Sequence, residues 1–121
     1  MIPLPVLQEI IKDTILDTQS LKRIGVTGSY ARGDFNERSD IDLVFDTGNL
    51  LMDESTIKAG ISIKSILGDQ FGHNVDVIMY STILTKTEQM NSEETLKGRL
   101  LALHGYKQML DDLKWIWRVE E

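Results

Sequence analysis

The sequence contains no cysteine and only two histidines, His73 and His104. A disulfide framework and cysteine-based zinc or iron–sulfur sites are therefore excluded, and a histidine-rich metal centre is not expected. No run of apolar residues approaches the roughly 20 that a membrane-spanning helix needs, and the first residues lack the basic start and apolar core of a secretion signal. These absences predict a cytoplasmic protein with no membrane partner.

Positive charge is also scarce. The chain has 13 Lys and Arg against 19 Asp and Glu, which gives a formal net charge of −6. Residues 1–80 carry most of the excess, with 7 basic and 12 acidic residues, whereas residues 81–121 carry 6 and 7. This balance disfavours long-range attraction to the phosphates of duplex nucleic acid. Clustered carboxylates either keep a surface soluble or bind hard cations, and their positions must decide.

The 121 residues, 41% of them hydrophobic, predict one globular domain over 1–121. Apolar spacing predicts a helix at 5–18 and another from Ser55 or Thr56 to Leu67. Alternating apolar residues predict strands at 22–27, 40–45 and 73–80. The fold class is therefore α/β (α+β), a small mixed β-sheet with flanking helices. His73, at the start of the third strand, is expected to contact solvent.

The C-terminal tail, residues 91–121, is predicted to be helical because large apolar side chains recur there at spacings of three and four. Gly98 and Gly105 weaken this helix, and a break near Gly105 is the alternative. The stripe consists of Leu96, Leu100, Leu103, Tyr106, Leu110, Leu113 and Trp117. It is longer than a sheet domain of this size needs, so part of it is expected to bury against another chain. This predicts a homodimer when the protein is alone and a heteromeric complex when a partner is present.

Asp40 and Asp42 are two residues apart on a predicted strand, so both carboxylates point to one face, with Cα atoms roughly 6.6 Å apart. Two unpaired anions side by side repel each other, and burying them is costly unless they share a cation. Oxygen-only ligands favour magnesium or manganese. Asp76, in the middle of the third predicted strand, is the candidate third carboxylate, and the alternative is an aspartate that simply faces solvent.

Gly28-Ser29 lies where a predicted strand gives way to a helical turn. Glycine lets an anionic ligand approach the backbone, and the amides that follow point at the ligand. A phosphate site beside paired metal-binding carboxylates is what the transfer of a nucleotidyl group requires, because metal ions must bridge protein and triphosphate oxygens.

Gly28-Ser29, ten further residues and then Asp40-Ile41-Asp42 resemble the signature of the DNA polymerase β-like nucleotidyltransferase superfamily. The longer pattern, Gly28-Ser29-x-Ala31-Arg32-Gly33 followed by Ser39-Asp40-Ile41-Asp42-Leu43, is similar to that of the minimal nucleotidyltransferases (MNT). The motifs lie within residues 20–80. The resemblance implies a polymerase β-like nucleotidyltransferase palm.

The resemblance also implies roles for individual residues. Gly28 and Ser29 would hold the β and γ phosphates of ATP, Asp40 and Asp42 would bind two Mg²⁺ ions, or Mn²⁺, and Asp76 would complete the metal site. Arg32 would contact phosphate or form an ion pair with Asp34 or Glu37, and both interpretations stay open. Small members of the family often act as antitoxins that adenylylate a tyrosine of a helical HEPN toxin.

Three hypotheses follow. The first is a protein adenylyltransferase that transfers AMP from ATP to a hydroxyl of a HEPN partner. The second is modification of a small molecule such as an aminoglycoside, although the roughly 40 residues after Tyr80 leave little room for a substrate-binding domain. The third is a binding module that neutralises a HEPN partner by contact alone, which would have no need for three converging carboxylates.

Overall fold

The structure, a computed structural model, describes residues 3–15, 21–36, 39–48, 54–91 and 105–119, with the backbone alone at 88–91. Its helices are α1 (Leu4–Thr14), α2 (Ser29–Arg32), α3 (Glu54–Ser65) and α4 (Tyr80–Asn91), with a π-helical turn at Ile66–Gln70 and a further helical segment at 105–112. Its strands are β1 (Arg23–Thr27), β2 (Ile41–Asp46), β3 (Val75–Met79) and β4 (Lys114–Arg118). None of the helices in these ranges is long and apolar enough to cross a membrane.

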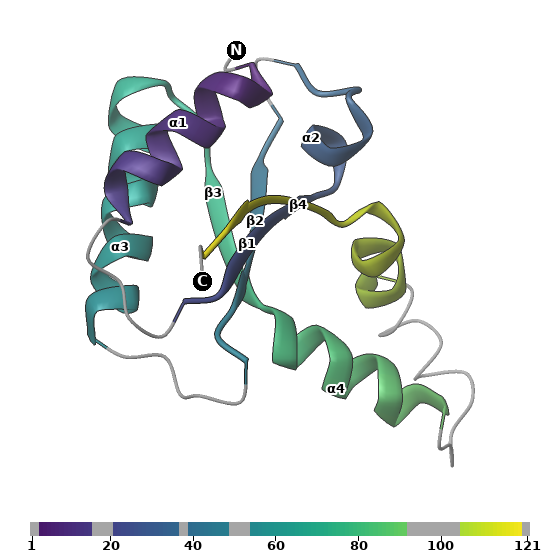
Figure 1. The fold of residues 1–121 in the computed structure, drawn as a ribbon. Helices are drawn as coiled ribbons and strands as arrows, with labels where there is room; N and C mark the ends of the chain where they lie inside the picture. Colours follow the sequence, from purple (N-terminus) through teal and green to yellow (C-terminus); the bar gives the residue numbers. More distant parts are fainter. Residues whose placement is uncertain (1–2, 16–20, 37–38, 49–53, 92–104, 120–121) are drawn as a thin grey trace.

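The strands form one sheet in the order β3-β2-β1-β4 (Figure 1). Strand β1 pairs antiparallel with both β2 and β4, whereas β2 and β3 run parallel. A parallel pair cannot be joined by a tight turn, and α3 lies in the long connection between these two strands. The mixed sheet with flanking helices confirms the fold class expected from the sequence.

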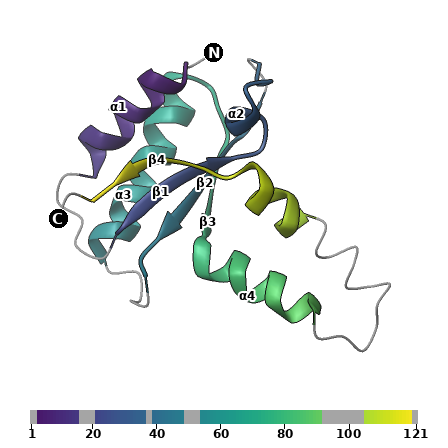
Figure 2. The same cartoon turned by 45° about the vertical axis from the view of Figure 1, so that its right-hand side comes forward.

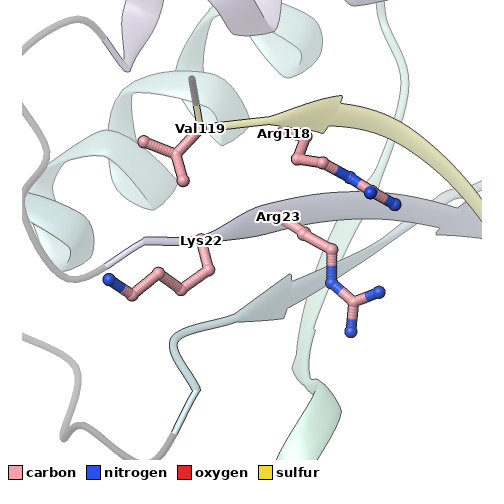
Figure 3. A pocket seen from close by; sticks show the side chains of 4 residues that line it. All are labelled: Lys22, Arg23, Arg118 and Val119. Atoms are coloured by element: carbon pink, nitrogen blue, oxygen red, sulfur yellow. The ribbon is translucent and has the colours of Figure 1, made fainter. Parts of the chain in front are cut away.

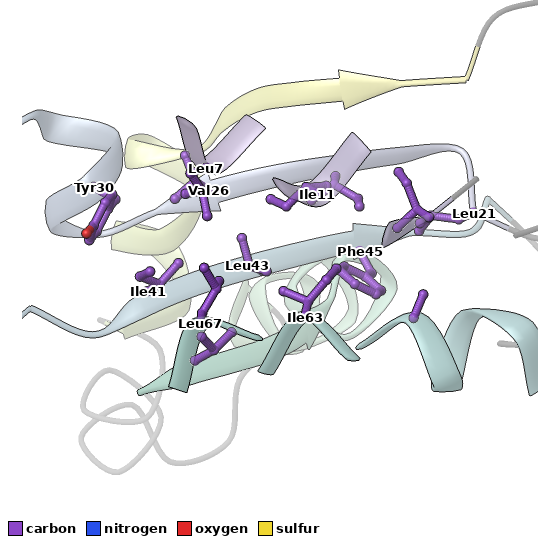
Figure 4. Close-up of a cluster of buried hydrophobic side chains, with 14 residues drawn as sticks. Leu7, Ile11, Leu21, Val26, Tyr30, Ile41, Leu43, Phe45, Ile63 and Leu67 are labelled. Atoms are coloured by element: carbon purple, nitrogen blue, oxygen red, sulfur yellow. The ribbon is translucent and has the colours of Figure 1, made fainter. Parts of the chain in front are cut away.

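Helices α1 and α3 cover one face of the sheet, and the hydrophobic core lies between them and the strands (Figures 1 and 4). Helix α1 begins directly after Pro3 and has Pro5 in its first turn, where the missing N–H costs nothing. The alternation of β1 and β2 sends every second side chain into this core. The buried strand residues on this face are Ile24, Val26, Ile41, Leu43, Phe45 and Val75.

The opposite face of the sheet carries the remaining strand side chains, among them Arg23, Thr27, Asp42 and Asp46. Helix α4 starts directly after β3, and together with the 105–112 segment it lies on the side of the sheet away from α1 and α3 (Figure 2). One face therefore packs against α1 and α3, and the other carries polar side chains together with the fully buried Val44.

The prediction of a helical tail is wrong over its last residues. Residues 105–112 are helical, but Leu113 follows the helix and 114–118 form β4, so Trp117 pairs with Ile24 of β1. Trp115, Ile116 and Trp117 form a short run of large apolar residues between Lys114 and Arg118, which suits a strand. The strand was missed because Leu110, Leu113 and Trp117 also fit a helical spacing of three and four. Leu96, Leu100 and Leu103 lie outside the described residues. The helical stripe from which a homodimer was expected is thus interrupted.

Close packing on β1 and a hydrogen bond from α1 hold strand β4 in place. Gly25 has no side chain where Leu113 and Trp115 pass, and a Cβ there would come within 2.5 Å of the Leu113 side chain. The register shifts between Ile24 and Gly25, and the carbonyl of Ile116 in the resulting bulge accepts a 3.1 Å hydrogen bond from Gln8 Nε2 of α1. The C-terminal strand is therefore built into the sheet.

Candidate active site

At one end of the sheet, three polar side chains from three strands lie in a row. Thr27 pairs with Asp42 in the antiparallel register of β1 and β2, and Asp42 pairs with Asp76 in the parallel register of β2 and β3. Paired residues of neighbouring strands project on the same face. Asp42 and Asp76 therefore share the face opposite the core, as the alternation of the sequence predicted for them.

Asp40 lies one residue before β2 and is exposed. The sequence predicted that Asp40 would open the strand, so the predicted boundary is one residue early. Ile41, the residue after Asp40, is held by a 2.8 Å hydrogen bond that its N–H donates to the carbonyl of Asn74. The negative charge of Asp40 acts on Asp42. All three predicted aspartates thus lie close enough for Asp42 to experience the other two.

The pKa of the Asp42 carboxyl is raised above its ordinary value. Its partial burial is the largest cause, and the negative charges of Asp76 and Asp40 follow. No cation of the described protein offsets these effects on Asp42. The carboxylate row is therefore a site where a bound cation would relieve both the burial and the repulsion.

Gly28 brings the loop after β1 into contact with this row. It has φ +72° and ψ −146°, a backbone conformation almost restricted to glycine, and a Cβ there would lie 3.0 Å from Asp42 Oδ2. The first turn of α2 follows, with Ala31 and Arg32 N–H groups donating to the Gly28 carbonyl. An anion held at Gly28-Ser29 would thus lie next to the Asp42 carboxylate.

Aromatic rings pack beside this loop and connect it to Ser39, the residue before Asp40. Tyr30 stacks on Phe35 with ring centroids 4.1 Å apart, and His73 meets the Tyr30 ring edge-on at 6.0 Å. His73 Nδ1 lies 3.0 Å from the carbonyl of Ser39, which can only accept, so Nδ1 is the donor. His73 is 3% exposed, and the expectation of a solvent-exposed histidine is wrong.

Arg32 forms ion pairs in the described structure. Its Nε lies 3.2 Å from Asp34 Oδ2, and its Nη1 lies 2.7 Å from Asp112 Oδ2. Hydrogen bonds to Asp34 and then to Asp112 raise the pKa of the Arg32 guanidinium. The pairing with Asp34 was one of the two interpretations of the sequence, whereas Glu37 lies outside the described residues. Asp112 was not anticipated.

The 105–112 segment is a wall of the site that the sequence did not reveal. Thr27 Oγ1 donates a 2.7 Å hydrogen bond to the carbonyl of Met109, which holds this segment over the end of β1. Asp112 reaches Arg32 from the same segment. No local pattern signals either contact, because the partners are about 80 residues apart in the chain.

The donor set of the row suits a divalent cation. Among the described residues, no three His, Cys, Asp or Glu side chains are grouped closely enough to hold a metal ion by themselves. Mg²⁺ in phosphate-handling sites usually takes one or two carboxylates and completes its shell with substrate phosphates and water. Asp42 and Asp76, beside the loop at Gly28, match that kind of incomplete site.

A pocket of about 520 Å³ lies elsewhere, lined by Lys22, Arg23, Arg118 and Val119 (Figure 3). Its residues come from the start of β1 and the end of β4, at the opposite end of the sheet from Thr27 and Asp42. Arg23 is already paired with Asp46. This pocket contains none of the predicted site residues, so the candidate active site is the carboxylate row.

Comparison with known proteins agrees with the motif. The family model described as "Nucleotidyltransferase domain" matches residues 8–102. A protein of Methanocaldococcus jannaschii, named "Putative protein adenylyltransferase MJ0435", is 37% identical over 71 residues. That alignment covers 57% of this chain and 70% of the relative.

A solved structure supports the fold. A crystal structure of a mutant of the toxin–antitoxin MntA-HpeT contains a chain with a TM-score of 0.55 and 16% identity, over 93% of this chain and 74% of that chain. A toxin–antitoxin with AMP-PNP gives a TM-score of 0.48 at 18% identity, over 86% of each chain. The second likeness is too weak to add to the fold assignment.

Proposed function

Because the chain belongs to the nucleotidyltransferase domain family, we propose that it transfers AMP from ATP to a hydroxyl group of a partner protein. The observation that carries this proposal is the row in which Asp42 lies beside Asp76, with the glycine of the Gly-Ser loop against Asp42. A carboxylate row beside a loop suited to phosphate is the arrangement that nucleotidyl transfer needs. The name of the M. jannaschii relative supports a protein as the acceptor.

In this proposal Gly28 and Ser29 hold the β and γ phosphates, and Asp40, Asp42 and Asp76 hold two Mg²⁺ ions. Bound metal would neutralise phosphate charge and favour the ionised form of the acceptor hydroxyl. The loop orients the triphosphate so that the α phosphorus faces the acceptor and pyrophosphate can leave. Asp40 and Asp76 are exposed, which leaves this side of the row open to an incoming hydroxyl.

The partner we propose is a HEPN toxin, with a tyrosine as the acceptor and this chain as its antitoxin. Support comes from the MNT-like motif and from the MntA-HpeT toxin–antitoxin, whose fold this chain shares. The row lies on the sheet face opposite the core, and Asp40 and Asp76 are exposed there. An acceptor carried by a separate protein therefore has a side from which to approach.

The test is to incubate the purified chain with a co-expressed HEPN protein, Mg²⁺ and ATP labelled at the α phosphate. Label on a partner tyrosine, lost with Asp42→Asn and kept with Asp69→Asn, would support the proposal. Asp69 is a matched control because it is an exposed carboxylate that bonds Ser65 and lies outside the row. If the Asp42→Asn variant transfers no label but still neutralises the toxin, the chain is an antitoxin that acts by contact alone. Label on an aminoglycoside instead would indicate a small-molecule enzyme.

A further inference from the structure

Arg32 is held by two carboxylates that bind different atoms of its guanidinium group. Asp34, two residues along the chain, accepts from Nε at 3.2 Å. Asp112, 80 residues away, accepts from Nη1 at 2.7 Å. Two carboxylates around one guanidinium leave a local charge of about −1, which opposes the approach of a phosphate. One of the two must therefore leave if Arg32 is to bind an anionic ligand.

The two carboxylates differ in how firmly they are held. The Asp34 side chain is 62% exposed, so water can replace Arg32 when it rotates away. The Asp112 side chain is only 10% exposed, and its second oxygen, Oδ1, accepts a 3.1 Å hydrogen bond from Gln108 Nε2. The segment that carries Asp112 is fixed by the bond between Thr27 and the Met109 carbonyl. Asp34 is thus the exchangeable partner and Asp112 the fixed one.

The geometry of arginine allows this exchange. Nε and Nη2 form one side of the guanidinium group, and two parallel N–H donors there match two oxygens of a phosphate. Asp34 occupies Nε on that side, whereas Asp112 binds Nη1. A phosphate could therefore replace Asp34 while Asp112 keeps its bond. Arg32 is one helical turn from Gly28, to whose carbonyl its N–H donates.

We propose that Asp112 is a positioning residue that orients Arg32 toward a phosphate of the bound nucleotide, and that Asp34 is the partner which this phosphate displaces. This inference rests on the proposed function, because it needs a nucleotide at the Gly28 loop. It gives the C-terminal segment a part in nucleotide binding, and it assigns opposite effects to two carboxylates on the same guanidinium.

The test measures the dissociation constant of a non-hydrolysable ATP analogue with Mg²⁺ for the full chain by calorimetry. Asp34→Ala should lower the constant about threefold, because it removes the competitor. Asp112→Ala should raise it about tenfold, because Arg32 loses the charge-assisted hydrogen bond that orients it. Asp112→Asn keeps the shape of the side chain and should fall between Asp112→Ala and the parent chain.

General electrostatics predicts a different result. Removing either negative charge weakens the repulsion of an anion, so on that basis both alanine variants would bind more tightly. Asp111→Ala measures this effect alone, because Asp111 is an exposed neighbour of Asp112. In an Arg32→Gln background neither Asp34→Ala nor Asp112→Ala should change the constant by more than Asp111→Ala does.

Shifts of the same sign in Asp34→Ala and Asp112→Ala, or shifts that persist in the Arg32→Gln background, would overturn the inference while leaving the proposed function intact. A parent chain that does not bind the analogue at all would overturn the proposed function and this inference with it. Melting curves of each variant with no nucleotide present separate binding from folding. A purely structural Asp112 would lower the melting temperature of Asp112→Asn without changing the constant for the folded protein, which would also overturn the inference.

Discussion

Asp42 of β2 lies directly beside Asp76 of β3 in the parallel register of the two strands, and Asp42 is the half-buried member of the pair. A sheet rarely gains stability from two like charges placed in this way, because each raises the cost of ionising the other. Packing alone does not explain the pair. A bound cation does explain the pair, because its positive charge would offset the repulsion between the two carboxylates.

Replacing Asp42 or Asp76 by Asn should lower the rate of nucleotidyl transfer at least about a hundredfold, because the row loses a negatively charged oxygen ligand. The metal-free variants should melt at the same temperature as the parent chain or higher, because repulsion is relieved. Transfer of labelled AMP and thermal melting without Mg²⁺ provide the two measurements. A large loss of stability in metal-free Asp42→Asn would show instead that the row has a structural role.

The raised pKa of Asp42 makes stability depend on pH with a defined sign. Between the ordinary aspartate pKa, about 3.9, and the higher value of folded Asp42, the folded state binds more protons than the unfolded state. Protonated Asp42 therefore contributes to the free energy of unfolding at low pH, and this contribution is lost as the pH rises through the pKa of the folded state. Urea denaturation of metal-free parent chain and Asp42→Asn should show a difference in unfolding free energy that grows in favour of Asn with pH and then levels off. A difference that shrinks with rising pH would contradict this assignment.

The sheet and the carboxylates were accessible from the sequence because local patterns encode them. Alternation placed β1, β2 and β3 within two residues at each end, and strand parity placed Asp42 and Asp76 on one face. Helix α4 was missed because it starts at Tyr80 directly after β3, with Met79 in place of a capping residue, and because its threonines weaken the helical pattern. Strand β4 and the contact of Asp112 with Arg32 were missed because they depend on pairing between distant parts of the chain.

Gly28→Ala should reduce both stability and nucleotide binding. A side chain at φ +72° and ψ −146° is strained by about 1–3 kcal/mol, and its Cβ would press on Asp42 Oδ2. The matched control is Gly33→Ala, since Gly33 has φ +85° but a Cβ there meets nothing within 4 Å. Both variants should lower the unfolding free energy, and only Gly28→Ala should weaken binding of an ATP analogue. Equal effects of the two variants on binding would show that backbone strain, and not contact with the row, is responsible.

Arg23 should stabilise the fold without contributing to catalysis, although it lines the pocket of Figure 3. Its Nη2 lies 2.7 Å from Asp46 Oδ2, and its guanidinium lies 3.8 Å from the centre of the Trp115 ring, so it joins β1 to β2 and β4. Arg23→Ala should lower the free energy of unfolding by about 2 kcal/mol, because it removes the stacking and leaves the partly buried Asp46 without its cation. Lys22→Ala, at the exposed neighbouring position, should change stability by less than about 0.5 kcal/mol.

Transfer of AMP by folded Arg23→Ala protein should match that of the parent chain, since Arg23 lies at the opposite end of β1 from Thr27. A specific loss of transfer in Arg23→Ala below its melting temperature would place this pocket in the catalytic reaction.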